Sequence, residues 1–160
     1  MKRIALLVSL VGILAAAPLQ AEFRQINITA FGMDCATCAH AMSVSIQKIP
    51  GVESVKVSTN WGLVTVMLKP GNTVRMEQIR KAILNDAFTP KEARVVALGQ
   101  LVFQNGKAEF KISGTNETFP VASTPHQSWQ QQVGHELTVS GLISASGTLQ
   151  ITSVSDSRPS

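Results

Sequence analysis

The feature that most restricts the fold of this 160-residue chain is the spacing of its apolar residues between Gln25 and Leu98. This spacing changes several times between the alternation of a strand and the longer period of a helix. Apolar and polar residues alternate from Ile26 to Ala30, which is the pattern of a half-buried strand. Apolar residues then recur at helical intervals from Cys38 to Lys48, and Pro50-Gly51 ends that segment. This part of the chain is therefore expected to begin with a strand followed by a helix.

The next residues return to strand patterns and then to a second helical pattern. Residues 52–57 and 63–68 have the composition of strands, and Asn60-Trp61-Gly62 between them is typical of a hairpin turn. A second helix is expected at 74–85 and a short last strand at 95–98. This order predicts a ferredoxin-like βαββαβ unit, which is an antiparallel sheet with both helices on one face.

The residues after Gly99 contain mainly strand patterns. Five short strands in about 55 residues suggest a small barrel or sandwich, and their rhythm loosely resembles a five-stranded OB-type barrel. We therefore expect an α+β chain with a ferredoxin-like unit at 22–98, a small all-β unit at 99–154 and a mobile tail at 155–160. The five expected strands are 101–103, 108–112, 118–121, 137–139 and 148–154.

Residues 1–21 have the features of a secretory signal peptide. Lys2 and Arg3 give a cationic start, and a mostly apolar run extends from Ile4 to Ala17. This run is 14 residues long, shorter than the roughly 20 residues that a helix needs to cross a bilayer. We therefore expect cleavage after residue 21 and export of the mature chain to the periplasm or the exterior; an uncleaved membrane anchor is the alternative.

The composition of the chain excludes several classes of protein. The whole chain has a net charge of +4, which falls to +2 without the two basic residues of the expected signal peptide. So small a charge gives no support for nucleic-acid binding. Two cysteines are too few for a disulfide framework, and 44% apolar residues are too many for a wholly disordered chain. The two cysteines therefore need a different explanation.

Both cysteines belong to one motif, GMDCATC at residues 32–38, where the first expected strand gives way to the first helix. A loop followed by a first helical turn can bring the sulfur atoms of Cys35 and Cys38 together. Unpaired backbone N–H groups at the start of a helix favour negatively charged thiolates. Two thiolates suit Cu(I) and other thiophilic ions, whereas a closed zinc site would need further ligands. Such an open pair suits a carrier, because a partner's thiols can attack the ion and take it.

These residues resemble the heavy-metal-associated domain family. The resemblance rests on GMDCATC, on Ile49-Pro50-Gly51-Val52 and on Asn85-Asp86-Ala87-Phe88, and we place it within residues 22–98. The family includes soluble copper chaperones, the metal-binding modules of copper-transporting P-type ATPases and periplasmic mercury-binding proteins. The resemblance implies the ferredoxin-like fold and makes Cys35 and Cys38 the metal ligands.

Four further positions acquire expected roles. By resemblance, Met33 packs inward and shapes the loop without coordinating, and Phe88 is an aromatic residue near the metal loop. Ala87 stands where the family commonly has glycine, a change expected to stiffen the loop but to leave the ligands untouched. An up-and-down chain path also returns Trp61 and Phe88 to the end of the sheet that bears the loop. We expect both to flank the thiolates; the alternative is that Trp61 only caps its hairpin and Phe88 belongs to the core.

Other interpretations of the cysteine pair remain open. CxxC is also a redox motif, but no Trp precedes Cys35 as in thioredoxin-like sites, and the expected βαββαβ order differs from a thioredoxin layout. A structural disulfide would close a very small loop and add little stability. His40 could be an auxiliary ligand, although a surface position is favoured, and His126 and His135 form no ligand spacing.

The sequence thus predicts an exported metal-binding protein without catalytic activity of its own. It would bind one soft ion, Cu(I) in preference to Hg(II) or Zn(II). It would pass the ion to a membrane transporter (a P-type ATPase or a mercury-type permease) or to another metal-binding protein, and reach the membrane only through such a partner. A periplasmic Hg(II)-binding protein, a thiol–disulfide redox protein and an interaction module acting through residues 99–154 are the alternatives. Because an oxidant could join Cys35 to Cys38, metal uptake is expected to require prior reduction.

Overall fold

The computed structural model describes residues 22–112, 114–122 and 132–156. The expected signal peptide and the last four residues of the expected tail lie outside this part. Neither helix of the described part is long and apolar enough to cross a membrane. The elements follow one another as β1 (Phe23–Phe31), α1 (Ala36–Gln47), β2 (Val52–Ser58), β3 (Leu63–Leu68), α2 (Met76–Asn85), β4 (Thr89–Gln104), β5 (Lys107–Lys111), β6 (Thr118–Pro120), β7 (Glu136–Ile143) and β8 (Leu149–Asp156).

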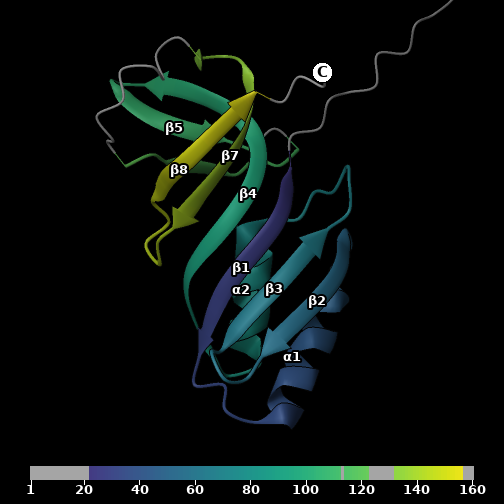
Figure 1. Cartoon of the computed structure of the whole chain (residues 1–160). Coiled ribbons are helices and arrows are strands. Elements are labelled where there is room, and N and C mark those ends of the chain that lie inside the picture. Colours follow the sequence, from purple (N-terminus) through teal and green to yellow (C-terminus); the bar gives the residue numbers. More distant parts are fainter. Residues whose placement is uncertain (1–21, 113, 123–131, 157–160) are drawn as a thin grey trace, which may run out of the picture.

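The first four strands and both helices confirm the predicted ferredoxin-like unit. The strands pair antiparallel in the order β2-β3-β1-β4, and both helices lie on one face of this sheet (Figure 1). Strand β1 lies inside the sheet, and its alternating Ile26, Ile28 and Ala30 side chains are fully buried. The helices begin within two residues of their expected starts, at Ala36 and Met76.

One hydrophobic core lies between the helices and the sheet and continues into the later strands. Met42 and Ile46 of α1, and Ile79 and Ile83 of α2, are fully buried at intervals of four residues, as one face of a helix requires. The same cluster includes residues of β5, β6, β7 and β8. The ring of Phe23 in β1 meets that of Phe119 in β6 edge-on, with centroids 6.1 Å apart.

Strand β4 differs from the sequence expectation. The prediction of two separate strands at 95–98 and 101–103 was wrong, because β4 runs unbroken through Gly99. It has partners on both edges: β1 and then β5 follow one edge, and β7 pairs along the other. A Cβ at Gly99 would clash with the carbonyl oxygen of Lys111, so glycine permits this close approach of the strands. The expected boundary between the two units therefore falls inside a strand that both groups of strands share.

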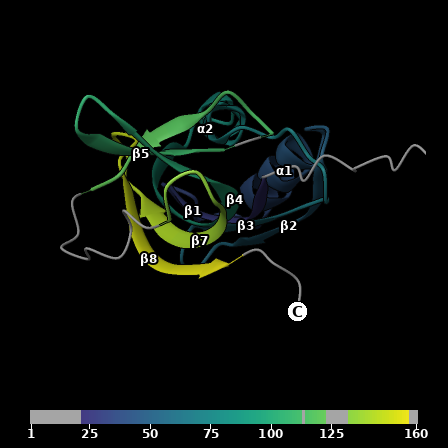
Figure 2. The same ribbon diagram turned by 90° about the horizontal axis from the view of Figure 1, so that it is seen from above.

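The strands after Gly99 pair in a ring. Strand β5 pairs with β6, β7 pairs with β8, and Val121 after β6 forms a parallel bridge to Leu149 at the start of β8. The N–H of Ala122 also donates to the carbonyl of Leu149 at 2.8 Å. In the view from above, β5 lies on one side of this group and β7 and β8 on the other (Figure 2). Pairing thus passes from β4 through β5, β6, β8 and β7 back to β4.

Polar contacts tie helix α2 to the later strands. The carboxylate of Glu117 accepts hydrogen bonds from the N–H groups of Met76 at 2.8 Å and Glu77 at 3.2 Å. It thereby satisfies two of the N–H groups that the first turn of a helix leaves free. Farther along α2, Arg80 donates to the carbonyl oxygen of Ser144 at 2.9 Å. Helix α2 is therefore held from outside the ferredoxin-like unit at two points.

The contact of Glu117 with α2 gives a pH dependence with a definite sign. Burial raises the pKa of Glu117 above its ordinary value of 4.5, although the two backbone hydrogen bonds oppose the shift. The folded state then keeps its proton at a pH where the unfolded chain has lost it. The free energy of unfolding should therefore fall as the pH rises through the window from the ordinary to the raised pKa. Urea unfolding of the native chain and of Glu117→Gln from about pH 4 to 7 tests this prediction. Because glutamine does not titrate, the free energy of unfolding of the variant should lack this part of the fall with pH. Equal slopes in both proteins would contradict the prediction.

Candidate metal centre

Residues 32–38 form the turn between β1 and α1. Gly32 has a φ of 95°, a conformation that favours glycine and turns the chain away from β1. Cys35 is the N-cap of α1: its backbone is extended, and its Sγ accepts a hydrogen bond from the N–H of Cys38 at 3.0 Å. Its carbonyl oxygen accepts the N–H of Ala39 at 3.0 Å. The sulfur thus takes the capping position usually held by a Ser or Asp oxygen, and the start of the helix brings Cys35 and Cys38 together.

Cys35 and Cys38 are joined by a disulfide, with their Cα atoms 5.2 Å apart, and both residues are partly buried. Addition of two electrons and two protons would open this bond to two neighbouring thiols. The free N–H groups and the dipole at the start of α1 favour negative charge at this point, and therefore thiolates. Such a pair can hold a thiophilic ion or exchange electrons as a dithiol and disulfide.

Met33 and Phe88 support the loop from the protein side. Met33 is only 5% exposed and belongs to the core, as the family resemblance implied. Phe88 is partly buried against the core, and its Cδ1 would lie 3.9 Å from a Cβ built on Gly32. The prediction that Phe88 lies near the cysteine loop is confirmed.

The end of α2 determines where Phe88 lies. The N–H of Phe88 donates to the carbonyl of Ile83 at 3.1 Å and that of Ala87 to Leu84 at 3.0 Å, the two bonds of a Schellman motif. This motif places Ala87 at a φ of 67°, the left-handed region that costs an alanine about 1–2 kcal/mol. The alanine noted in the sequence therefore occupies a backbone position suited to glycine.

A side-chain contact also joins the end of α2 to α1. The Oγ of Ser45 donates to Oδ1 of Asp86 at 3.1 Å, whereas Oδ2 of Asp86 is buried without a partner in the described residues. Nothing in the sequence identifies this contact, because the two residues lie 41 positions apart.

Trp61 lies in the β2–β3 turn and is 80% exposed. The carbonyl of the next residue, Gly62, accepts the N–H of Ala30 at 2.7 Å, which fixes the turn beside the last residues of β1. Phe31, the last residue of β1, is also exposed, and Nζ of Lys91 lies 5.2 Å from the centre of its ring. Trp61 is therefore at the end of the sheet where the cysteine loop begins, as the chain path predicted.

Within the described residues, no histidine is grouped with the cysteine pair. His40 is exposed on α1, His135 is exposed before β7, and His126 lies outside the described residues. Across residues 22–112, 114–122 and 132–156, no three or more His, Cys, Asp or Glu side chains are grouped so that they could hold a metal ion. The candidate site in this part of the chain therefore consists of the two sulfurs.

Comparison with known proteins gives matches to part of this chain. Residues 27–88 match the model of the heavy-metal-associated domain. A stretch of 66 residues is 36% identical to human copper-transporting ATPase 2, covering 41% of this chain and only 4% of that protein. Among solved structures, the CopZ metallochaperone is 27% identical over 41% of this chain and 97% of its own. Oxidized MerP from Ralstonia metallidurans CH34 is 19% identical over 42% and 93%; both structures have a TM-score of 0.39.

The strained backbone beside the site predicts a stabilising substitution. Ala87→Gly removes the left-handed backbone strain of about 1–2 kcal/mol from the folded state. Glycine also gives the unfolded chain more conformational freedom, which lowers the free energy of unfolding by roughly 0.4–1 kcal/mol. We expect the free energy of unfolding in urea to rise by up to about 1.6 kcal/mol. The same change inside α2, Ala82→Gly, should lower it by about 1 kcal/mol. A similar loss of stability in both variants would contradict the account of Ala87.

Proposed function

We propose, from the match of residues 27–88 to the heavy-metal-associated domain, that the chain is a metal carrier with Cys35 and Cys38 as its ligands. It binds one soft ion, Cu(I) in preference to Hg(II) or Zn(II), and catalyses no reaction of its own. It acts in the periplasm or outside the cell, after loss of residues 1–21. The observation that carries this proposal is the meeting of the two sulfurs at the start of α1.

The preference for Cu(I) follows from the ligands. Thiolates are soft donors that select Cu(I) among the common ions, whereas structural zinc sites use four protein ligands. The described residues offer no third His, Cys, Asp or Glu side chain grouped with the two sulfurs. Hg(II) is also satisfied by two thiolates, so the ligands alone favour both soft ions. The 36% identity to a segment of a copper-transporting ATPase supports copper.

Transfer of the ion would proceed by exchange of ligands. A thiolate of the partner adds to the metal, one bond from Cys35 or Cys38 breaks, and a second thiolate displaces the remaining cysteine. The charge of the ion does not change, and no oxidant or reductant is consumed. The partner we propose is a membrane transporter (a P-type ATPase or a mercury-type permease) or another metal-binding protein. The chain would reach the membrane only through that partner.

We further propose that strands β4 to β8 form a small OB-like barrel with a structural or protein-docking role. The ring of strand pairing and its buried Phe110, Leu137 and Leu149 support the barrel. The contacts of Glu117 and Arg80 with α2 support a structural role, because α2 ends beside the cysteine loop. No nucleic-acid partner is proposed, since the mature chain carries a net charge of only +2.

A thiol–disulfide exchange protein is the second candidate, and the Cys35–Cys38 disulfide itself favours it. An incoming thiolate would attack one sulfur, form a mixed disulfide and release the other sulfur as a thiolate. A second thiol of the same partner would then release the reduced pair and become oxidised. Rapid reduction of insulin by the reduced chain would support this function over metal carriage.

Anaerobic metal titration tests the proposed function. The reduced mature chain should bind one Cu(I) per molecule and compete for it with a Cu(I) chelator. The oxidised chain should bind none, because both sulfurs are occupied by their bond to each other. Parallel titrations with Hg(II) and Zn(II) rank the three ions.

Matched variants identify the ligands in this experiment. The Cys35→Ser, Cys38→Ser double variant should lose Cu(I) binding, whereas His40→Ala should keep it, because His40 is exposed on α1. Equal binding by the double variant and the native chain, or by oxidised and reduced protein, would overturn the proposal.

The predicted place of Trp61 beside the thiolates can be followed by fluorescence. The chain has two tryptophans, so Trp129→Phe leaves Trp61 as the only emitter. Because the turn of Trp61 is bonded to β1 beside the loop, Cu(I) binding to the reduced variant should change its emission. The same variant with both cysteines replaced by serine should show no change. Unchanged emission on stoichiometric Cu(I) binding would show that Trp61 does not flank the metal.

A further inference from the structure

The ferredoxin-like sheet has one face that no helix of the described part covers, and β7 and β8 extend it beyond β4 (Figure 1). We call this the open face. Strand register aligns one row of residues across it, because each member pairs with the next on the neighbouring strand. From β2 to β8 the row is Lys56, Thr65, Asn27, Arg94, Leu142 and Gln150.

The open face carries an unusual share of exposed apolar side chains. Phe31, Leu63 and Met67 lie on it by strand alternation and are 67%, 36% and 38% exposed. Trp61 adjoins them in the β2–β3 turn. These four account for half of the large apolar side chains that are exposed in the described residues. Exposed apolar side chains on one face of a sheet are typical of a surface that contacts a partner.

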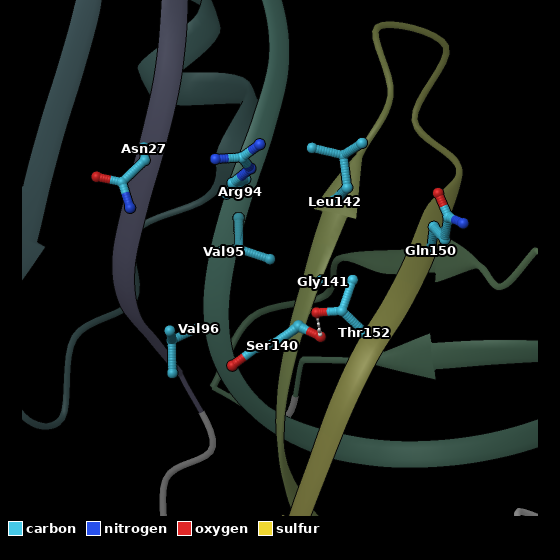
Figure 3. Close-up of a pocket in the computed structure, with 9 residues that line it drawn as sticks. All are labelled: Asn27, Arg94, Val95, Val96, Ser140, Gly141, Leu142, Gln150 and Thr152. Atoms are coloured by element: carbon cyan, nitrogen blue, oxygen red, sulfur yellow. Dashed lines mark hydrogen bonds between the residues drawn. The ribbon is translucent and has the colours of Figure 1, made fainter.

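Two hollows lie on the open face around Arg94. One, of about 350 Å³, extends from Asn27 on β1 to Gln150 and Thr152 on β8 (Figure 3). Figure 3 shows Arg94 between Asn27 and Leu142. The other, of about 330 Å³, shares Asn27, Arg94 and Leu142 and also includes Glu92 and Leu63. Side chains of a partner could therefore insert on both sides of Arg94.

Two opposite charges stand next to each other at the centre of this face. Glu92 and Arg94 are exposed, lie two residues apart on β4 and line the same hollow. Within the described residues neither makes an ion pair. A partner that fits this centre must therefore present a positive group to Glu92 and a negative group to Arg94, on either side of Ala93.

We propose that the open face is an interface between two copies of this chain. In this dimer the two open faces pack against each other, and the two-fold axis lies between them, perpendicular to the strands and above Ala93. Each β4 then lies antiparallel over the β4 of the other copy. Arg94 of each chain then faces Glu92 of the other, and both pairs form at once, as an isologous interface requires. A two-fold axis along the strands would instead place like charges opposite each other, so the charges select the first arrangement.

The size of the face indicates a weak dimer. Six strands spaced by about 4.8 Å, each contributing about six residues of 3.4 Å, would give at most roughly 24 by 20 Å per chain, because β7 and β8 also belong to the ring of later strands and must curve. Two such faces bury at most on the order of 1,000 Å², which is at the lower limit of specific interfaces. Association should therefore depend on protein concentration. The proposal is independent of metal carriage, because it uses neither Cys35 nor Cys38.

Charge exchange tests the interface. Sedimentation velocity of the mature chain over a range of concentrations should show a monomer–dimer equilibrium. Glu92→Arg and Arg94→Glu should each raise the dissociation constant at least about tenfold, because each places like charges opposite one another. The double variant, Glu92→Arg with Arg94→Glu, restores both pairs and should recover most of the dimer. Its recovery cannot arise from misfolding of the single variants.

Matched controls separate this interface from other kinds of association. Lys107→Glu, at the exposed start of β5, should leave the equilibrium unchanged. The Cys35→Ser, Cys38→Ser variant without metal should dimerise as the native chain does, which excludes bridging by a disulfide or an ion. A monomer at all concentrations, equal dimerisation of all charge variants, or a double variant as weak as the single ones would overturn the proposal. A monomer that keeps full Cu(I) binding would refute the dimer and leave the metal carrier intact.

Discussion

The pairing of β4 along both edges is the constraint on which the rest of this structure depends. One edge holds β1 and β5, and the other holds β7. Because a strand has two hydrogen-bonding edges, β4 can serve the helix-covered sheet and the later strands at once. The side chains on its inner side, such as Ala93, Val95 and Leu101, belong to one continuous core. Two groups of elements that read as separate units in the sequence are thereby joined through backbone bonds and packing.

This arrangement also determines how firmly the cysteine loop is supported. The loop leaves from β1, which lies between β3 and β4, and enters α1. On its other side, Phe88 follows α2, whose first turn is capped by Glu117 from the later strands. The part of the chain outside the heavy-metal-associated match therefore supports the helix that ends beside the site. That is a physical reason for the two groups of elements to occur in one chain.

The sequence predicted the parts of the fold that depend on local period and motif. The order βαββαβ, the inward Met33 and the position of Phe88 agree with the structure. The strand break at Gly99 was wrong, because glycine suggests an interruption unless the close partner strand is known. The contact between Glu117 and α2 could not be predicted, since it joins residues about 40 positions apart and has no local pattern.

The capping role of Cys35 couples the chemistry of the pair to the start of α1. Its sulfur accepts the N–H of Cys38 while both sulfurs are joined in the disulfide. A thiolate is a stronger acceptor than a neutral sulfur, because a charge-assisted hydrogen bond is about twice as strong as a neutral one. Reduction should therefore strengthen the hydrogen bond from the N–H of Cys38 to the sulfur of Cys35. A cation bound to that sulfur should weaken the hydrogen bond again, because it withdraws negative charge from the sulfur. The helix start thus favours the thiolate state from which the proposed carrier would take up an ion, and it would give up part of that interaction when the ion binds.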